Sequence, residues 1–312
     1  MKKALILLNM GGPNNLDEVS VFLKNMFNDR YILTIKNSFF RSILANLITK
    51  FRVKAATQNY KAIGGKSPIV DITDSLVKKL RKEVEFDVDY AMNYTPPFSK
   101  DVFKKYESYD EIVLFPLYPH HSTTTVISSL DDAKKAIKEL GISAKIYEIP
   151  TFFENKIYNN IIINSIKNSV SGLNNDEISN TTLIFSAHSL PQKIINRGDM
   201  YENDIENHVD ILSDLLEKEN LNFKEIKLAY QSRLGPVQWL GPNLSEVLPT
   251  LENKRALIYP ISFCVDNSET DFELSIEYNH IAKKNNFEFY GVVKCPNDSD
   301  EFVEFIKEIS KI

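Results

Sequence analysis

The sequence contains little cysteine and no long apolar run. Its 312 residues include two cysteines, Cys264 and Cys295, which are too few for a disulfide framework or a four-thiolate cluster. No apolar segment approaches the roughly 20 residues that span a bilayer. The apolar stretch at 4–8 runs into Asn9 without the small-residue cleavage site of a signal peptide, so we interpret it as a buried strand. We therefore expect a protein of the reducing cytoplasm that does not cross a membrane.

Blocks of like charge and the common nucleotide signatures are also missing. The formal net charge of -5 comes from acidic and basic residues mixed along the chain, which does not indicate nucleic-acid binding. No G-x-G-x-x-G follows the first predicted strand, and Tyr60 replaces the first glycine of a phosphate-binding loop before Gly65-Lys66-Ser67. Ser186 and Ser189 do not lie in the G-x-S-x-G turn of serine hydrolases. A small-molecule ligand other than a nucleotide is favoured.

The pattern of apolar residues predicts alternating strands and helices. Strand candidates are short apolar or β-branched runs at 4–8, 88–92, 112–117, 144–149, 181–187, 226–230, 256–261 and 287–293. Segments with helical spacing lie between them, at 16–27, 69–84, 129–140, 156–170, 202–217 and 268–284. Such alternation predicts parallel sheets covered by helices on both faces. We predict two similar doubly wound α/β domains, each with a four-stranded parallel sheet.

The domain boundary is expected near Pro150 to Asn155. The predicted domains are 1–150 and 151–294, and a C-terminal helix at 301–312, within 295–312, is expected to return to the first domain. In sheets of this kind, ligands bind beyond the carboxyl ends of the strands. In both halves, the segments with candidate functional residues directly follow predicted strands. We therefore expect these segments to line one cleft between the domains.

His188 ends the apolar run Leu183-Ile184-Phe185 and would point toward this ligand side. A single histidine in such a place is either a satisfied core residue or a functional group. An imidazole there can bind a borderline metal or accept a proton near neutral pH, since its ordinary pKa is about 6.5.

Glu269, Glu273 and Glu277 follow one another at intervals of four residues and therefore share one face of a predicted helix. For Glu277 we favour a solvated acidic face. Glu269 differs because it lies in the first turn, at the ligand end of its strand. A carboxylate there, facing His188, would supply one nitrogen and one oxygen ligand to a transferable divalent ion.

Several other residues have two interpretations. His120 and His121 are either ligands of a second metal site or ordinary packed residues. Trp239 is either a core residue or part of the wall of a site for a flat aromatic ligand. Met10 and Tyr94 either contact an apolar ligand or pack their loops. The segment Tyr31 to Phe51 is unusually apolar with interspersed Lys and Arg. It is either a packed helix or a hydrophobic lip that receives a ligand at a membrane surface.

Seven motifs, in order along the chain, resemble those of the ferrochelatase family. They are Leu-Asn-Met-Gly-Gly-Pro at 8–13, Ile-Gly-Gly-Lys-Ser-Pro at 63–68, Tyr-Pro-His-His-Ser at 118–122, Phe-Ser-Ala-His-Ser-Leu-Pro at 185–191, Asn-Arg-Gly-Asp at 196–199, Gln-Ser-Arg-Leu-Gly-Pro-Val-Gln-Trp-Leu-Gly-Pro at 231–242 and Asp-Asn-Ser-Glu-Thr at 266–270. The resemblance implies a chelatase-like fold of two α/β domains clasping a porphyrin. It also implies an enzyme, a lyase that inserts ferrous iron into protoporphyrin IX at the last step of haem synthesis.

The resemblance assigns roles to particular residues. It implies that His188 and Glu269 are catalytic and handle the metal, with Glu273 on the same helix as a further metal or proton group. We further expect Met10, Tyr94, Ser122, Ser189 and Trp239 to bind the porphyrin. Ferrous iron is a substrate here, and neither a resident cofactor nor an iron–sulfur cluster is expected. Peripheral contact at the inner membrane face, through 31–51, stays open, as does the oligomeric state.

The sequence also departs from the family pattern. Asn267 occupies a place that is often histidine, His120-His121 replaces a more usual Gln-Tyr, and Val126-Ile127 interrupts a Thr-Thr-Gly-like run. Alternatives to the main reading are a coproporphyrin III ferrochelatase, a chelatase for cobalt or nickel, and a non-catalytic haem or porphyrin carrier.

Overall fold

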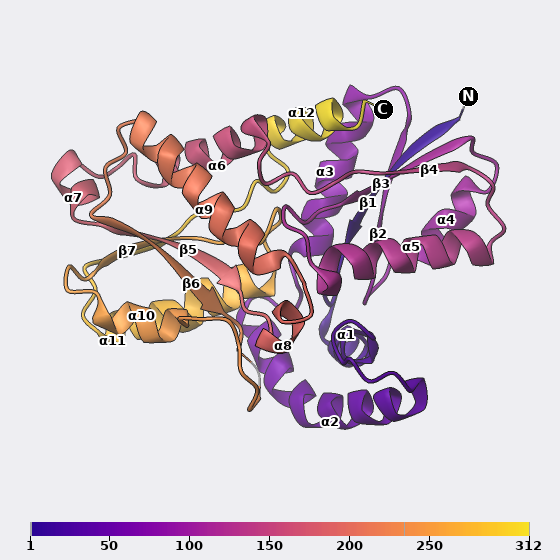
Figure 1. The fold of residues 1–312 in the computed structure, drawn as a ribbon, viewed down its shortest axis with the longest axis horizontal. Coiled ribbons are helices and arrows are strands. Elements are labelled where there is room, and N and C mark those ends of the chain that lie inside the picture. The colour runs from indigo at the N-terminus through magenta and orange to yellow at the C-terminus, as the bar shows by residue number, and fades with distance from the viewer. Residues whose placement is uncertain (1, 234, 312) are drawn as a thin grey trace. The chain divides into compact units, whose positions relative to one another are not determined.

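A computed structural model of the protein describes residues 2–233 and 235–311 (Figure 1). Met1, Leu234 and Ile312 lie outside the described residues, and Ile312 is the end of the last predicted helix. The chain divides into two compact units. The N-terminal unit comprises Met1–Tyr118, Ser122–Thr151 and Asn297–Ile312, and the C-terminal unit comprises Pro119–His121 and Phe152–Pro296.

The N-terminal unit is built on a four-stranded sheet in the order β2-β1-β3-β4. Its strands are β1 (Lys3–Asn9), β2 (Asp87–Met92), β3 (Glu111–Pro116) and β4 (Lys145–Glu148), and all are parallel. Residues 4–8 of β1 are buried on both faces, as continuous apolar strands are in parallel sheets. All four strands match predicted ones.

Helices of several lengths connect these strands. They are η1 (Leu16–Glu18), α1 (Val19–Asn28), α2 (Ser38–Ala62), α3 (Ile69–Glu83), α4 (Ser99–Phe103), η2 (Lys104–Tyr106), the π-helix η3 (Thr123–Ile127), α5 (Ser128–Glu139) and α12 (Asp300–Ile309). Figure 1 shows α12, at the C-terminal end of the chain, beside α3. Lys79 of α3 donates to Asp300 at 2.8 Å, and Phe302 and Phe305 of α12 are fully buried. The last helix therefore completes the hydrophobic core of this unit.

Helix α2 begins beyond the start of the predicted apolar segment, because Asn37 caps it by accepting hydrogen bonds from the amides of Phe39 and Phe40. One side of α2 is packed, with Ala45 and Tyr60 buried, whereas Phe39 is 67% exposed and Phe51 is 76% exposed. The segment is therefore a packed helix on one side and leaves an apolar surface exposed on the other.

The C-terminal unit repeats the strand order of the first, as β6-β5-β7-β8. The strands are β5 (Thr182–His188), β6 (Glu225–Gln231), β7 (Arg255–Tyr259) and β8 (Phe289–Val292), again all parallel. The predicted fold class, two similar domains with four-stranded parallel sheets, is confirmed. The carboxyl ends of β5, β6 and β7 lie together because these strands are neighbours.

The helices of the C-terminal unit are α6 (Lys156–Ser169), α7 (Asn175–Ser179), α8 (Gln192–Ile195), α9 (Tyr201–Lys218), α10 (Leu244–Thr250), the π-helix η4 (Glu269–Tyr278) and α11 (Asn279–Lys284). The helix predicted at 268–284 is confirmed as helical from Glu269 to Lys284, but Glu269–Tyr278 has the wider turns of a π-helix. The apolar spacing does not encode the wider turns of a π-helix, which occur mostly at functional sites. No helix among the described residues is long and apolar enough to span a membrane.

Candidate metal-handling site

The geometry of the C-terminal unit brings His188 and Glu269 into direct contact. His188 is the last residue of β5 and Glu269 is the first residue of η4, which follows the neighbouring strand β7. His188 Nδ1 lies 2.8 Å from Glu269 Oε2, and their side chains are 34% and 19% exposed. A carboxylate only accepts, so Nδ1 carries the proton of this bond. The sequence prediction that these two residues face each other agrees with this contact.

The Glu269 carboxylate is held by two further donors. Its Oε2 accepts from Gln231 Nε2 at 3.2 Å and from Ser232 Oγ at 2.9 Å. Gln231 is fully buried, and its side-chain oxygen Oε1 accepts from Ser186 Oγ at 2.7 Å. The carboxylate therefore has one orientation, fixed from the ends of β5 and β6.

Asn267 occupies the place where the family often has histidine, and here it positions the backbone. Its Oδ1 accepts from the amide of Glu269 at 2.8 Å, and its Nδ2 donates to the carbonyl of Val265. Asn267 is buried, so it does not present a second titratable ring to a ligand. The amide instead ties Glu269 to the loop before η4.

Each member of the His188–Glu269 pair shifts the pKa of the other. Burial alone would lower the pKa of His188, but the negative charge and hydrogen bond of Glu269 outweigh it and raise that pKa above 6.5. Burial alone would raise the pKa of Glu269, but His188, Ser232 and Gln231 together lower it below 4.5. The pair therefore favours an imidazolium beside a carboxylate.

Glu273 extends the site through one hydroxyl. Burial and the nearby charge of Glu269 raise the pKa of Glu273 to about 8, and its Oε2 contacts Ser232 Oγ. Ser232 has one proton and lies within hydrogen-bond distance of both carboxylates, so it donates to one of them at a time. With a pKa of about 8, Glu273 is mostly protonated at neutral pH. Ser232 has a left-handed backbone, with φ at 67°, which is uncommon for a residue with a side chain.

Sequence reasoning missed Gln231 and Ser232 as individual members of the site. Both lie in the quoted motif at 231–242, immediately after a predicted strand. Their position at the carboxyl end of that strand could therefore have indicated that they belong to the site. What the sequence did not contain was the strand order that places β6 next to β5.

Ser189 and Trp239 lie in the same unit as His188 and Glu269. Ser189 is fully buried and donates to the carbonyl of Leu240 at 3.0 Å, so its hydroxyl joins two loops. Trp239 pairs through its backbone with Pro191, and its side chain is only partly buried. The interpretation of Trp239 as a core anchor is therefore not supported by its burial. Porphyrin binding by both residues stays a prediction.

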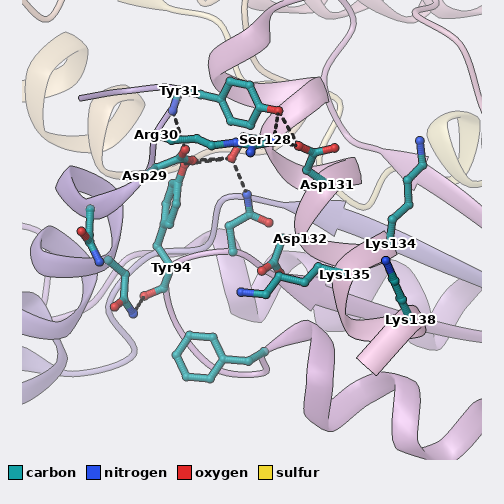
Figure 2. A pocket seen from close by; sticks show the side chains of 14 residues that line it. Asp29, Arg30, Tyr31, Tyr94, Ser128, Asp131, Asp132, Lys134, Lys135 and Lys138 are labelled. Carbon is teal, nitrogen blue, oxygen red and sulfur yellow. Dashed lines mark hydrogen bonds and ion pairs between the residues drawn. The ribbon is translucent and has the colours of Figure 1, made fainter. Parts of the chain in front are cut away.

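Met10, Tyr94 and Ser122 belong to the N-terminal unit. Met10 is partly exposed, and Ser122 is buried and caps η3 through the amide of Thr124 at 3.1 Å. Tyr94 lines a cavity of about 820 Å³ (Figure 2). Its hydroxyl donates to Asp29 at 2.6 Å, and Ser128 donates to the same carboxylate. Porphyrin binding by these three residues, and the single cleft, stay predictions.

His120 is not arranged as a metal ligand. His208 Nε2 lies 2.9 Å from Asn159 Oδ1, and His120 Nε2 lies 2.8 Å from His208 Nδ1. Burial lowers the pKa of both rings, that of His208 to about 3, so both are neutral. Within the part of the chain that the structure describes, no three His, Cys, Asp or Glu side chains are grouped to hold a metal ion.

Comparison with known proteins identifies the family. The Ferrochelatase family model matches residues 2–311. The chain belongs to the ferrochelatase family. Ferrochelatase of Campylobacter fetus is 60% identical over 98% of this chain and 98% of its own length, and ferrochelatase of Campylobacter jejuni is 52% identical over 97% of each. The predicted resemblance is confirmed, and with it the assignment of the chain to an enzyme family of lyases.

Solved structures support the ferrochelatase fold independently. SirB from Bacillus subtilis, in a structure with Fe³⁺, superimposes with a TM-score of 0.56. The alignment covers 100% of this chain and 96% of SirB at 12% identity. At that identity the likeness shows a common fold and nothing about the substrate.

Proposed function

We propose that this chain inserts ferrous iron into protoporphyrin IX to form protohaem, with release of two protons, and that His188 and Glu269 handle the metal and the protons. The proposed reaction rests on membership of the ferrochelatase family. The proposed roles of His188 and Glu269 rest on one observation. His188 Nδ1 lies 2.8 Å from Glu269 Oε2 in a partly exposed site where β5 ends and η4 begins.

The reaction needs a group that can hold a proton or a metal near neutral pH. A free-base porphyrin carries two inner N–H protons, and its ring must bend before a metal can reach the nitrogens. Binding the periphery of the ring can supply about 1–5 kcal/mol of such distortion. Two protons must then leave while ferrous iron loses water. A partly exposed imidazole beside a carboxylate is suited to both tasks.

The free nitrogen of His188 is the reacting atom in this proposal. Because Nδ1 donates to Glu269, Nε2 is the position that gains or loses a proton: the imidazolium that the pair favours carries a proton there, and the neutral ring carries its lone pair there. Among the described residues, Nε2 has no hydrogen-bond partner. One lone pair can bind ferrous iron or accept a pyrrole proton, but not both at once. The two events at His188 are therefore successive, and Glu269 stabilises the imidazolium that proton transfer creates.

Glu273 is proposed as the next group for protons or metal. Its contact with Ser232 connects it to Glu269 through a single hydroxyl. A proton can therefore pass between Glu269 and Glu273 through this hydroxyl, but toward Glu273 only after Glu273 has released its own proton. We regard Glu273 as an accessory group because it does not contact His188.

We also propose peripheral contact with an anionic membrane surface through α2. Phe39, Ile43, Leu47 and Phe51 are four residues apart, so they form one stripe, and they are 49–76% exposed. No Asp or Glu occurs between Arg30 and Asp71, whereas seven Lys or Arg lie at 36, 41, 50, 52, 54, 61 and 66. An apolar stripe among cationic residues is typical of helices that bind anionic lipid.

A cytoplasmic location and the absence of a resident cofactor complete the proposal. Cys264 and Cys295 are free and buried, and burial raises the pKa of Cys264 to about 12. Protonated, buried thiols are poor iron ligands. We therefore propose that the chain holds no iron–sulfur cluster and that iron enters only as a substrate.

The test is anaerobic incubation of the purified protein with ferrous iron and protoporphyrin IX, followed through the porphyrin absorption spectrum. Coproporphyrin III is run in parallel, and cobalt and nickel replace iron in separate assays. We expect protohaem formation that disappears in His188→Ala and Glu269→Ala while porphyrin still binds. Binding without metallation by the wild type would favour a carrier, and faster turnover of coproporphyrin III would replace the substrate.

A further inference from the structure

Two hydroxyl groups hold the backbone of His188. Its amide donates to Ser262 Oγ at 3.0 Å, and its carbonyl accepts from Tyr201 Oη at 2.9 Å. The two hydroxyl oxygens lie 2.7 Å apart. Ser262 is 9% exposed and Tyr201 is 6% exposed, so both groups lie behind His188 within the C-terminal unit.

Proton counting fixes the direction of all three bonds. A carbonyl oxygen only accepts, so Tyr201 uses its one proton on the carbonyl of His188. Tyr201 Oη must then accept from Ser262 Oγ, and Ser262 accepts the amide proton of His188. The result is a closed ring of three hydrogen bonds. Loss of either hydroxyl interrupts the ring and leaves the amide or the carbonyl of His188 without its partner.

The ring forms where the sheet ends. Strand β7 pairs with β5 up to Phe185 and Tyr259, and the amide of Ile261 still donates to Ser186 at 3.1 Å. Beyond that point the backbones no longer pair, and the side chain of Ser262 accepts the His188 amide in place of a ladder bond. Tyr201, the first residue of α9, supplies the matching donor. Three separate segments thus meet at the backbone of one residue, His188.

We propose that Ser262 and Tyr201 are positioning residues for iron insertion. They hold the His188 backbone so that its ring keeps the 2.8 Å contact with Glu269 and presents Nε2 to the substrate. This inference rests on the proposed function, because it assigns His188 to the reaction. A small displacement of a reacting group costs rate more than substrate affinity. We therefore expect the effect in kcat.

The experiment compares Tyr201→Phe, Ser262→Ala and the double variant in the anaerobic insertion assay. We expect kcat to fall about tenfold in each single variant, as loss of one hydrogen bond to a buried group predicts, with the porphyrin KM within about twofold. The double variant should lose little more, because one break already opens the ring. Ser262→Thr keeps the hydroxyl and should restore kcat.

The matched control variants remove a tyrosine and a serine hydroxyl at other positions of the same unit. Tyr230→Phe deletes a buried hydroxyl that has no hydrogen-bond partner, and Ser213→Ala deletes the bond from Ser213 Oγ to the carbonyl of Val209 on α9. Both should leave kcat unchanged. The chain has five histidines, so nitrogen-15 labelling of histidine gives a spectrum simple enough to follow His188. Its Nδ1–H signal should shift in Tyr201→Phe and Ser262→Ala.

The outcomes are distinct. A lower kcat with constant KM, a shifted His188 signal and rescue by Ser262→Thr support the proposal. Unchanged kcat in both single variants, or an equal loss in the controls, overturns it. Failure of the wild type to insert iron contradicts the proposed function instead, and the His188 spectrum still reports whether the two hydroxyls position the ring.

Discussion

Glu269 and Glu273 share one hydroxyl group, that of Ser232. Ser232 Oγ lies 2.9 Å from Glu269 Oε2 and also contacts Glu273 Oε2, and its one proton can go to either carboxylate. Two carboxylates one helical turn apart would repel each other if both were ionised. The site avoids this because Glu273 keeps its proton, with a pKa raised to about 8 by burial and by the charge of Glu269.

This relationship predicts how stability depends on pH. Between the ordinary pKa of about 4.5 and the folded value of about 8, folded Glu273 holds a proton that the unfolded chain releases. The free energy of unfolding therefore loses this contribution as pH rises through that window. Glu273→Gln has no proton to lose, so its stability relative to the wild type should increase with pH and level off above about 8.

Urea unfolding from about pH 5 to about pH 9 measures this difference. Glu277→Gln is the control, because Glu277 is an exposed glutamate of the same helix. A constant difference between Glu273→Gln and the wild type across this range would show that Glu273 is not protonated in the folded protein.

Removal of the Glu269 charge should lower the pKa of His188. Burial lowers that pKa, and the Glu269 carboxylate raises it more than the nearby Glu273 does, so in Glu269→Gln burial is opposed only by the smaller effect of Glu273. We expect the His188 ring to titrate below its ordinary value of 6.5, where the wild-type ring titrates above it. NMR titration of labelled histidine measures both, and a wild-type value below 6.5 would contradict the structure.

His120, His208 and Asn159 form a series of hydrogen bonds, and its interruption at Asn159 should lower the stability of the protein. Asn159 accepts from His208 and donates to the carbonyl of Phe153 at 2.9 Å, and it is 1% exposed. Asn159→Ala leaves a buried imidazole N–H unpaired, which should lower the free energy of unfolding by about 1–3 kcal/mol. Denaturant unfolding measures it.

Asn160→Ala is the matched control for this change. Asn160 is the exposed neighbour of Asn159 on α6, so its truncation should change the free energy of unfolding by less than about 0.5 kcal/mol. Equal losses in the two variants would mean that the buried hydrogen bond contributes nothing specific, because helix propensity favours alanine over asparagine at both positions.

The exposed stripe of α2 predicts binding to anionic vesicles. Ile43→Ser and Phe51→Ser should each weaken binding several-fold, since each removes exposed apolar area that lipid would cover. Ile157→Ser is the control, because Ile157 is 46% exposed on α6 whereas Ile43 is 51% exposed on α2. Co-sedimentation with anionic and with neutral vesicles measures it. Equal loss in the control, or no binding by the wild type, would refute a membrane role for α2.

Much of the architecture was readable from the sequence by itself. Continuous apolar runs such as Ala4 to Leu8 predicted buried parallel strands, because both faces of such a strand must be covered. The alternation with helical spacing predicted two similar domains. His188 and Glu269 were identified because each follows a strand, at the edge of a sheet where ligands bind. The ordered motifs then predicted the family, which the comparisons confirmed.

Only the tertiary structure decided how the site is assembled. Gln231, Ser262 and Tyr201 come from three segments, and they reach His188 and Glu269 because β6, β5 and β7 are neighbours and α9 begins beside them. The π-turns of η4 and the left-handed backbone of Ser232 are also invisible in the apolar pattern. Strand order and hydrogen-bond direction depend on contacts between distant parts of the chain. Periodicity in the sequence records only which faces are buried.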